Sequence, residues 1–171
     1  MTGEDRMATL ERRIRVLEDE SDIRSVLVAY GFGVDSGDAP GTAALYKNDS
    51  LTVIDTNIII DGAEGIHEMV LGPEHQAILP GCAHVMGPFE IRVNGDTAVA
   101  VGYATTFTRT GGEIGVWRQS VNRWNLERRL ETWVIARRES RSLADPSASE
   151  FLQLGLPSGD HDIASGNGGQ G

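Results

Sequence analysis

The sequence predicts an α+β fold in which helices gather on one side of a strongly curved antiparallel sheet. Three observations support this class. Helical periodicity opens the chain, long segments rich in β-branched residues fill its second half, and glycine-containing turns join those segments. A bent sheet with a helix across its open mouth would surround a concave, largely apolar pocket, a usual binding place for a small ligand.

Two helices are expected at the start of the chain. On the first, apolar residues recur at intervals of three and four among charged ones: Met7, Leu10, Ile14 and Leu17. The polar run at 19–22 is expected to interrupt this helix, with Ser21 or Asp22 capping a second one. The second helix ends before the turn-rich residues 35–41, and its apolar face consists of Ile23, Val26, Leu27 and Tyr30.

Shorter elements are expected in the middle of the chain. A short helix over 42–47 precedes a strand over 51–60, which ends at the Asp61-Gly62 turn. Residues 62–81 then indicate one or two short helices, separated at Gly72-Pro73.

Four β segments and a closing helix follow. The strands are expected over 84–94, 97–109, 115–128 and 131–140. Asp145-Pro146 is a typical start for a helix that runs through Leu154. Residues 157–171 show no apolar periodicity and are expected to form a disordered tail, so the predicted single domain covers residues 1–156.

Composition and charge argue against several kinds of partner. With a formal net charge of −10, the chain is a poor match for the phosphate backbone of nucleic acid, which needs a clustered basic face. The arginines of its C-terminal third alternate with glutamates, which indicates a solvated sheet face. There is no apolar run of roughly 18 residues and no secretory leader, so we expect a cytoplasmic protein that does not contact a membrane.

The sequence also offers no recognisable cofactor or metal motif. Cys82 is the only cysteine, which excludes an intramolecular disulfide and argues against a cysteine-based zinc site. His67 and His75 lack the spacing of metal ligands, and there is no phosphate-binding loop or dinucleotide motif. We therefore expect neither a metal nor a cofactor.

Tyr30, Asp35 and His84 are the candidate catalytic residues. Each has an ordinary structural explanation when considered alone: a core tyrosine, a turn carboxylate and a core-edge histidine. If all three line one cavity, the carboxylate orients the imidazole and makes it a better base. The tyrosine hydroxyl could then polarise a carbonyl or hold a water.

The strand over 115–128 offers a candidate pocket wall. By alternation, one face mixes small polar groups with apolar ones: Val116, Arg118, Ser120, Asn122, Trp124 and Leu126. We assign Ser120, Asn122 and Trp124, together with Asp55 from the strand over 51–60, as candidate substrate-binding residues. The other face is amphipathic and could contact a partner subunit, with Trp117, Val121 and Trp133 as candidates to be covered.

Taken in order, these segments resemble the SnoaL-like branch of the nuclear-transport-factor-2-like (NTF2-like) superfamily, from about Leu10 to Leu156. The segments that carry the resemblance are "DIRSVLVAYGFGVDSGD", "IDGAEGIHEMV", "CAHVMGPFEIRVNGDTAVAVGYA", "NRWNLERRLETWVIARR" and "LADPSASEFLQLGL". The resemblance implies a cone-shaped, cystatin-like α+β barrel with a deep pocket under the first helices. It also implies a homo-oligomer, a dimer or trimer, that associates through the outer sheet face.

Within that superfamily, the pattern of Tyr30, Asp35 and His84 is similar to the catalytic set of scytalone dehydratase and bile-acid 7α-dehydratase. There an Asp–His pair works as acid and base while a tyrosine assists at the substrate carbonyl, and Ser120 and Asn122 match substrate-contacting positions. The chain departs from both enzymes at 104–110, which contains neither the second histidine of one nor the carboxylate of the other.

The resemblance implies a cofactor-independent lyase or isomerase that acts on a cyclic carbonyl compound of polyketide, steroid or aromatic type. Two alternatives stay open. One is a non-catalytic module that binds a small, partly apolar molecule. The other is an epoxide hydrolase or polyketide cyclase that activates water with Asp35 or Asp55. In that case Asp55 would pair with Arg118 in partial imitation of limonene epoxide hydrolase.

Overall fold

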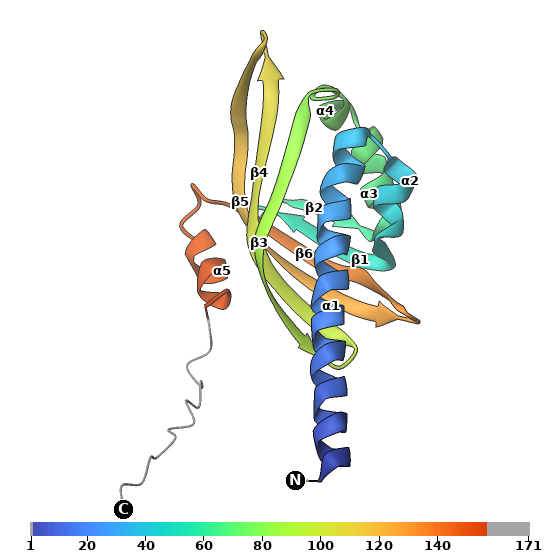
Figure 1. The fold of residues 1–171 in the computed structure, drawn as a ribbon. Coiled ribbons are helices and arrows are strands. Elements are labelled where there is room, and N and C mark those ends of the chain that lie inside the picture. Colours follow the sequence, from blue (N-terminus) through green and yellow to red (C-terminus); the bar gives the residue numbers. More distant parts are fainter. Residues whose placement is uncertain (1, 157–171) are drawn as a thin grey trace, which may run out of the picture.

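The computed structural model describes residues 2–156 and shows one open, curved sheet with helices on both of its faces (Figure 1). The helices are α1 (Gly3–Ser36), α2 (Ala39–Ala44), α3 (Gly62–Leu71), α4 (Pro73–Gln76) and α5 (Ala148–Leu154). The strands are β1 (Tyr46–Ile54), β2 (Ile58–Asp61), β3 (Cys82–Asn94), β4 (Thr97–Thr110), β5 (Glu113–Arg129) and β6 (Thr132–Ser142). This architecture confirms the α+β prediction.

Helix α1 is one continuous helix of 34 residues, so the expected division into two helices is wrong. It begins with a capping box between Thr2 and Asp5 and ends at Gly37, whose φ of 71° lies in the left-handed region. The polar run at 19–22 does not break the helix, because Asp19 finds partners on the sheet. Its carboxylate accepts a hydrogen bond from Trp133 Nε1 at 3.3 Å and pairs with Arg128 at 2.7 Å.

The strand expected over 51–60 is in fact a hairpin of β1 and β2. The chain reverses at Asp55, whose positive φ of 54° breaks the strand. Strand β1 also begins earlier than expected, at Tyr46, because α2 takes the place of the helix expected over 42–47. Asp38 caps α2 by accepting a hydrogen bond from the backbone N–H of Gly41 at 2.9 Å, and Pro40 lies in its first turn.

The sheet has the strand order β2-β1-β6-β5-β4-β3. Strands β3 to β6 form an antiparallel meander close to the expected boundaries, whereas β1 pairs with β6 in parallel. In this register His84 lies opposite Thr106, and Thr106 lies opposite Arg118, so the three residues share one face of the sheet.

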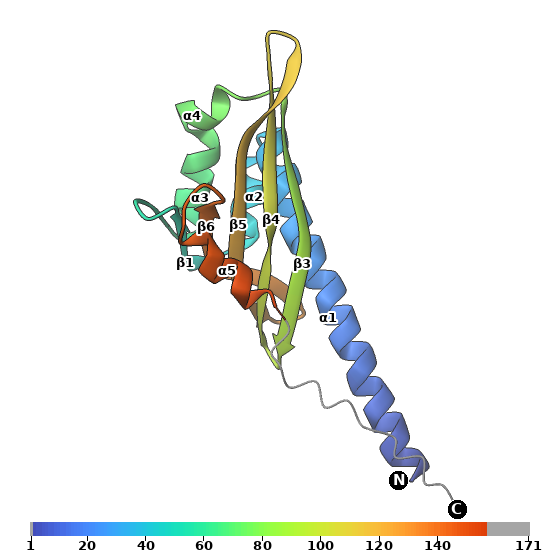
Figure 2. The same cartoon turned by 90° about the vertical axis from the view of Figure 1, so that its left-hand side faces the viewer.

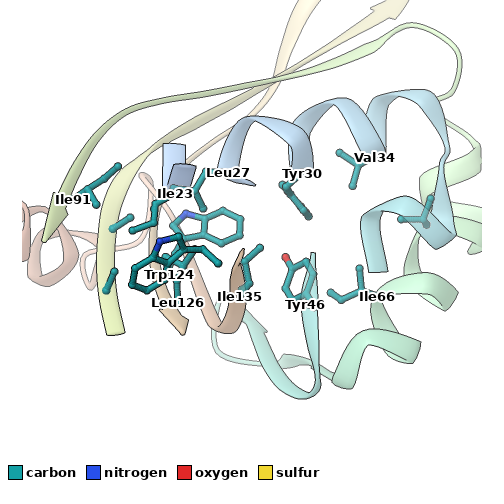
Figure 3. Close-up of a cluster of buried hydrophobic side chains, with 14 of the residues drawn as sticks. Ile23, Leu27, Tyr30, Val34, Tyr46, Ile66, Ile91, Trp124, Leu126 and Ile135 are labelled. Carbon is teal, nitrogen blue, oxygen red and sulfur yellow. The ribbon is translucent and has the colours of Figure 1, made fainter. Parts of the chain in front are cut away.

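The main core lies between α1 and the concave face of the sheet. Figure 3 shows apolar side chains of α1 facing those of β1, β5 and β6. A smaller cluster of Val101, Val121, Ala148 and Phe151 lies under α5, on the opposite face (Figure 2). The prediction that a partner subunit covers Val121 and Trp133 is therefore wrong. Helix α5 covers Val121, and Trp133 lies in the main core. Trp117 is exposed.

Between residues 2 and 156, no helix combines the length and the apolar content that crossing a membrane requires. The closing helix begins at Ala148, where Asp145 accepts hydrogen bonds from the backbone and hydroxyl of Ser147 just before it. The tail predicted over 157–171 lies outside the described residues.

Candidate functional site

Asp35 and His84 are in direct contact. The last turn of α1 presents Asp35 to the start of β3, where His84 Nδ1 lies 2.6 Å from Asp35 Oδ1. The other carboxylate oxygen, Oδ2, accepts a hydrogen bond from the backbone N–H of His84 at 2.7 Å. Because both oxygens are engaged by one residue, the carboxylate sets the orientation of the ring and favours the tautomer with the proton on Nδ1.

A glycine allows α1 to approach β3 this closely. A Cβ added at Gly31 would lie 2.8 Å from the backbone oxygen of His84, which is nearer than real Cβ contacts come. Without a side chain at Gly31, α1 lies close enough to β3 for Asp35 to contact the imidazole.

Burial and charge act in opposite directions on His84. Burial lowers the pKa of His84 below 6.5, the hydrogen bond and charge of Asp35 oppose that shift, and the positive charge of Arg138 adds to it. The balance of these effects therefore favours the neutral imidazole. The side chains of His84 and Asp35 are 14% and 20% exposed, so the pair is not fully sealed from solvent.

Cys82 is a third member of this group. Its thiol donates a hydrogen bond to Asp35 Oδ1 at 3.3 Å, and burial, followed by the nearby carboxylate, raises its pKa to about 11. The ligand atoms of Asp35, Cys82 and His84 all lie within 4.8 Å of one another, so these side chains could hold a metal ion. Sequence spacing could not show this, because the ligands come from α1 and β3.

His75 also lies beside the pair, although nothing in the sequence pointed to it. Its Nε2 lies 2.7 Å from the backbone oxygen of Val34, and its ring centroid lies 6.3 Å from that of His84. Through the first contact, α4 holds the last turn of α1, and the second places another imidazole near that of His84.

Arg138 is the most important residue that the sequence reasoning missed. The sequence pattern predicted that Arg138 lies on a solvated face. In the structure it is only 6% exposed and lies between α1 and the concave face of the sheet. The reason is a register shift between β5 and β6 near Ala136, which reverses the alternation of β6. Strict alternation from Trp133 and Ile135 would have pointed Arg137 inward instead.

Arg138 contacts two of the predicted substrate-binding residues, Asn122 and Trp124, and is linked to a third, Ser120, through Asn122. It donates a hydrogen bond to the Tyr30 hydroxyl and two more, at 3.1 Å each, to Asn122 Oδ1. The guanidinium also lies 4.6 Å from the ring centre of Tyr30 and 4.7 Å from that of Trp124. Asn122 in turn donates to Ser120 Oγ at 3.1 Å, so these polar groups form one network.

This interior contains buried polar atoms without a partner. Among the described residues, no hydrogen bond is made by the hydroxyls of Tyr46, Ser50 and Thr52 or by the indole N–H of Trp124. Such groups are rare in proteins and mark places where a polar group of a ligand, or a water, can bind.

Three hollows of about 980, 340 and 330 Å³ lie away from Asp35 and His84. The deep pocket expected beside these two residues therefore stays a prediction.

Asp55 and Arg118 form a separate ion pair two strands away from His84. Arg118 donates two hydrogen bonds to the Asp55 carboxylate, at 2.9 and 3.0 Å, and this contact lowers the pKa of that carboxyl. The backbone N–H of Ser142 donates a third at 3.0 Å. With both oxygens engaged, Asp55 is a poor candidate for activating water.

Comparison with known proteins adds to this geometry. Residues 15–139 match the sequence profile of a family described as a SnoaL-like domain. An NTF2-like protein of cystatin-like fold from Novosphingobium aromaticivorans is 34% identical, with a TM-score of 0.82, over 85% of this chain and 96% of that one. No curated protein sequence matches the chain.

More distant structures share the fold. A proposed scytalone dehydratase from the same organism is 18% identical, with a TM-score of 0.65, over 74% of this chain and 85% of its own. A structure named LinA is 16% identical, with a TM-score of 0.68, over 76% of this chain and 89% of its own. At these identities the likeness concerns the fold alone, whereas the profile covers most of the chain: the protein belongs to the SnoaL-like domain family of the NTF2-like superfamily.

Proposed function

We propose that this protein is a cofactor-independent lyase or isomerase that removes a proton next to the carbonyl of a cyclic, partly apolar compound. One observation carries the proposal: the 2.6 Å contact between Asp35 Oδ1 and His84 Nδ1, with Oδ2 held by the His84 backbone. A carboxylate fixed in this way orients the imidazole and stabilises the imidazolium that forms when the ring takes a proton.

His84 Nε2 is the atom that takes the proton. Among residues 2–156 it has no hydrogen-bond partner, while Nδ1 is committed to Asp35. Its lone pair is free at neutral pH, because burial lowers the pKa of the ring. A base with these properties works best against a carbon acid whose negative charge is stabilised by another group.

The network of Arg138, Tyr30 and Asn122 provides that stabilisation in our proposal. Arg138 is a buried cation, and within the described residues no carboxylate pairs with it. It donates to the oxygen of Tyr30, which leaves the tyrosine hydrogen to donate to a ligand oxygen. Negative charge that develops on a carbonyl oxygen here would be stabilised strongly, because solvent screening is weak.

The reaction then follows from these positions. Nε2 takes the proton from the carbon next to the carbonyl, and the electron pair of the broken C–H bond moves to the carbonyl oxygen. In a lyase the pair returns to expel a β-hydroxyl group, which takes up the proton and leaves as water. In an isomerase the proton returns to a different carbon.

Solvent exchange tests this proposal without knowledge of the natural substrate. Cyclic ketones and β-hydroxyketones would be incubated with the protein in D₂O, and deuterium incorporation next to the carbonyl would be followed by NMR. We expect exchange with the unmodified chain, loss of exchange in His84→Gln, and retention in His67→Gln, which changes a histidine outside the site.

Equal exchange in the two histidine variants would exclude His84 as the base. Binding of the same ketones without any exchange, and with unchanged affinity in His84→Gln, would instead identify a non-catalytic binding module. Ring opening of an epoxide without carbon-bound exchange would indicate a hydrolase.

A further inference from the structure

The N-terminal half of α1, residues 3–18, extends beyond the edge of the sheet (Figure 1, Figure 2). Four large apolar side chains on this half are between 43% and 64% exposed: Met7, Leu10, Ile14 and Leu17. We call these four residues the N-terminal stripe. Four apolar side chains aligned along a projecting helix indicate a surface that binds another protein.

The domain itself does not cover the stripe. The residues through which α1 contacts the sheet include Ile23, Leu27 and Val34, on one side of the helix. Given 3.6 residues per turn, the N-terminal stripe faces largely away from that side, about 140° around the helix axis. A partner that contacts the stripe would therefore meet the helix without displacing the sheet.

The spacing of the stripe is that of a coiled coil. Met7 and Ile14 lie seven residues apart and occupy a positions, while Leu10 and Leu17 occupy the d positions of the same two heptads. A β-branched residue at a combined with leucine at d favours two parallel strands. The stripe therefore fits a second helix of the same kind better than a flat surface.

The flanking charges indicate which helix that is. The g positions hold Arg6 and Arg13, and the e positions that follow them hold Glu11 and Glu18. In a parallel pair, each g residue lies against the e residue of the next heptad on the other helix. Arg6 would then meet the partner's Glu11, and Arg13 would meet the partner's Glu18.

By symmetry, two copies in parallel make four such attractive pairs. An antiparallel arrangement would place arginine against arginine and glutamate against glutamate. Among the described residues, none of these four side chains makes an ion pair within its own chain, so all are available to a partner.

We infer that the N-terminal half of α1 binds a second copy of this chain as a parallel, two-stranded coiled coil. The globular parts of the two copies then lie on the outer sides of the helix pair, because the stripe faces away from the sheet. This interface differs from the outer sheet face that the family resemblance implies, and it does not depend on the proposed function.

Sedimentation equilibrium of the full chain at increasing protein concentration tests the interface. We expect a concentration-dependent dimer, and we expect Leu10→Glu with Ile14→Glu to raise its Kd by more than about a hundredfold, since two apolar layers are lost. Circular dichroism should show an intact fold, because both side chains are exposed in the monomer. A chain that stays monomeric at all concentrations, or a dimer unaffected by these changes, would overturn the inference.

Charge exchange tests the parallel orientation. Arg6→Glu with Arg13→Glu turns four attractive pairs into repulsive ones and should weaken the dimer about tenfold. Adding Glu11→Arg and Glu18→Arg restores every parallel pair and should restore the affinity. The control Arg12→Glu with Arg15→Glu makes the same change in net charge outside the e and g positions and should have little effect.

Failure of the fourfold variant to recover would exclude a parallel pair. A cross-link provides a second measurement: with Cys82→Ala as background, Leu10→Cys places two thiols opposite one another only if the helices are parallel and in register. We expect a disulfide-linked dimer on mild oxidation. Its absence in a sample that still dimerises would likewise contradict the parallel arrangement.

Discussion

The two halves of α1 follow one another without a break, yet their surroundings differ completely. Both carry apolar residues at helical spacing, and the sequence alone does not show which half is buried. The C-terminal half is buried against the sheet and carries Asp35 in its last turn, whereas the N-terminal half projects with its stripe exposed. An amphipathic pattern therefore predicts that a helix face makes a contact, but it does not identify the partner. The partner depends on where the rest of the fold lies.

Replacing Asp35 by Asn should have the largest effect, at the C-terminal end of the helix. An amide cannot stabilise the imidazolium, so we expect kcat/KM to fall by about a thousandfold if the pair acts as proposed. The pKa of His84 should also fall further, because Asp35 raises it, and the acidic limb of the pH–rate profile should move to lower pH. Kinetics from pH 4 to 9 would measure both.

Asp22→Asn is the matched control, since it changes an exposed carboxylate of the same helix and should leave the profile unchanged. An Asp35→Asn variant with an unshifted acidic limb would show that Asp35 does not raise the pKa of His84.

Leu27→Ala and Leu17→Ala compare the two halves directly. Leu27 is fully buried, so its truncation should cost about 2–5 kcal/mol of unfolding free energy. Leu17 is 64% exposed, so its truncation should change the stability of the monomer by less than about 0.5 kcal/mol. Urea denaturation at low protein concentration would measure both, and similar costs would mean that the N-terminal half is covered within the monomer.

Gly31→Ala should cost about 1–3 kcal/mol, because the added Cβ would lie 2.8 Å from the backbone oxygen of His84 and overpack the contact between α1 and β3. Gly3→Ala is the counterpart in the N-terminal half, where nothing lies within 4 Å of the added carbon. That variant should be neutral or slightly stabilising. Thermal denaturation compares the two, and equal melting temperatures would contradict the tight contact at Gly31.

The smallest effect concerns stability and pH. Burial lowers the pKa of His84 in the folded state below 6.5, so the unfolded chain binds the proton more readily. Stability should therefore fall slightly as the pH drops from about 6.5 towards the folded pKa. His84→Gln should remove this part of the slope in denaturation curves measured from pH 5 to 8, and an unchanged slope would argue against a lowered pKa.

Local patterns predicted most helices and strands, but not where these elements are interrupted or continuous. The four long strands and the closing helix lie near their expected positions, because alternation and turn residues act over a few neighbours. The unbroken helix α1 was missed because Asp19 is satisfied by Trp133 and Arg128, which lie more than 100 residues further along the chain. The break at Asp55 was missed because a strand-like composition does not show a positive φ.

The residues of the candidate site could likewise be predicted only in part. Family resemblance pointed to Asp35 and His84, and their side chains are in contact, although their catalytic role stays a proposal. Alternation places Cys82 on the same face of β3 as His84, two residues away, but His75 comes from α4 and could not be placed beside the pair from spacing. Arg138 was assigned to the wrong face, because one register shift reverses the alternation of β6.

Sequence patterns were enough to predict the α+β class, the order of most elements, the apolar stripe of residues 7–17 and the residue types available for acid–base chemistry. Three features depend on tertiary contacts: which half of α1 is buried, the inward position of Arg138, and the side chains that surround His84. Propensity and periodicity act between residues a few positions apart, whereas burial, strand register and the satisfaction of a buried charge depend on groups that folding brings together.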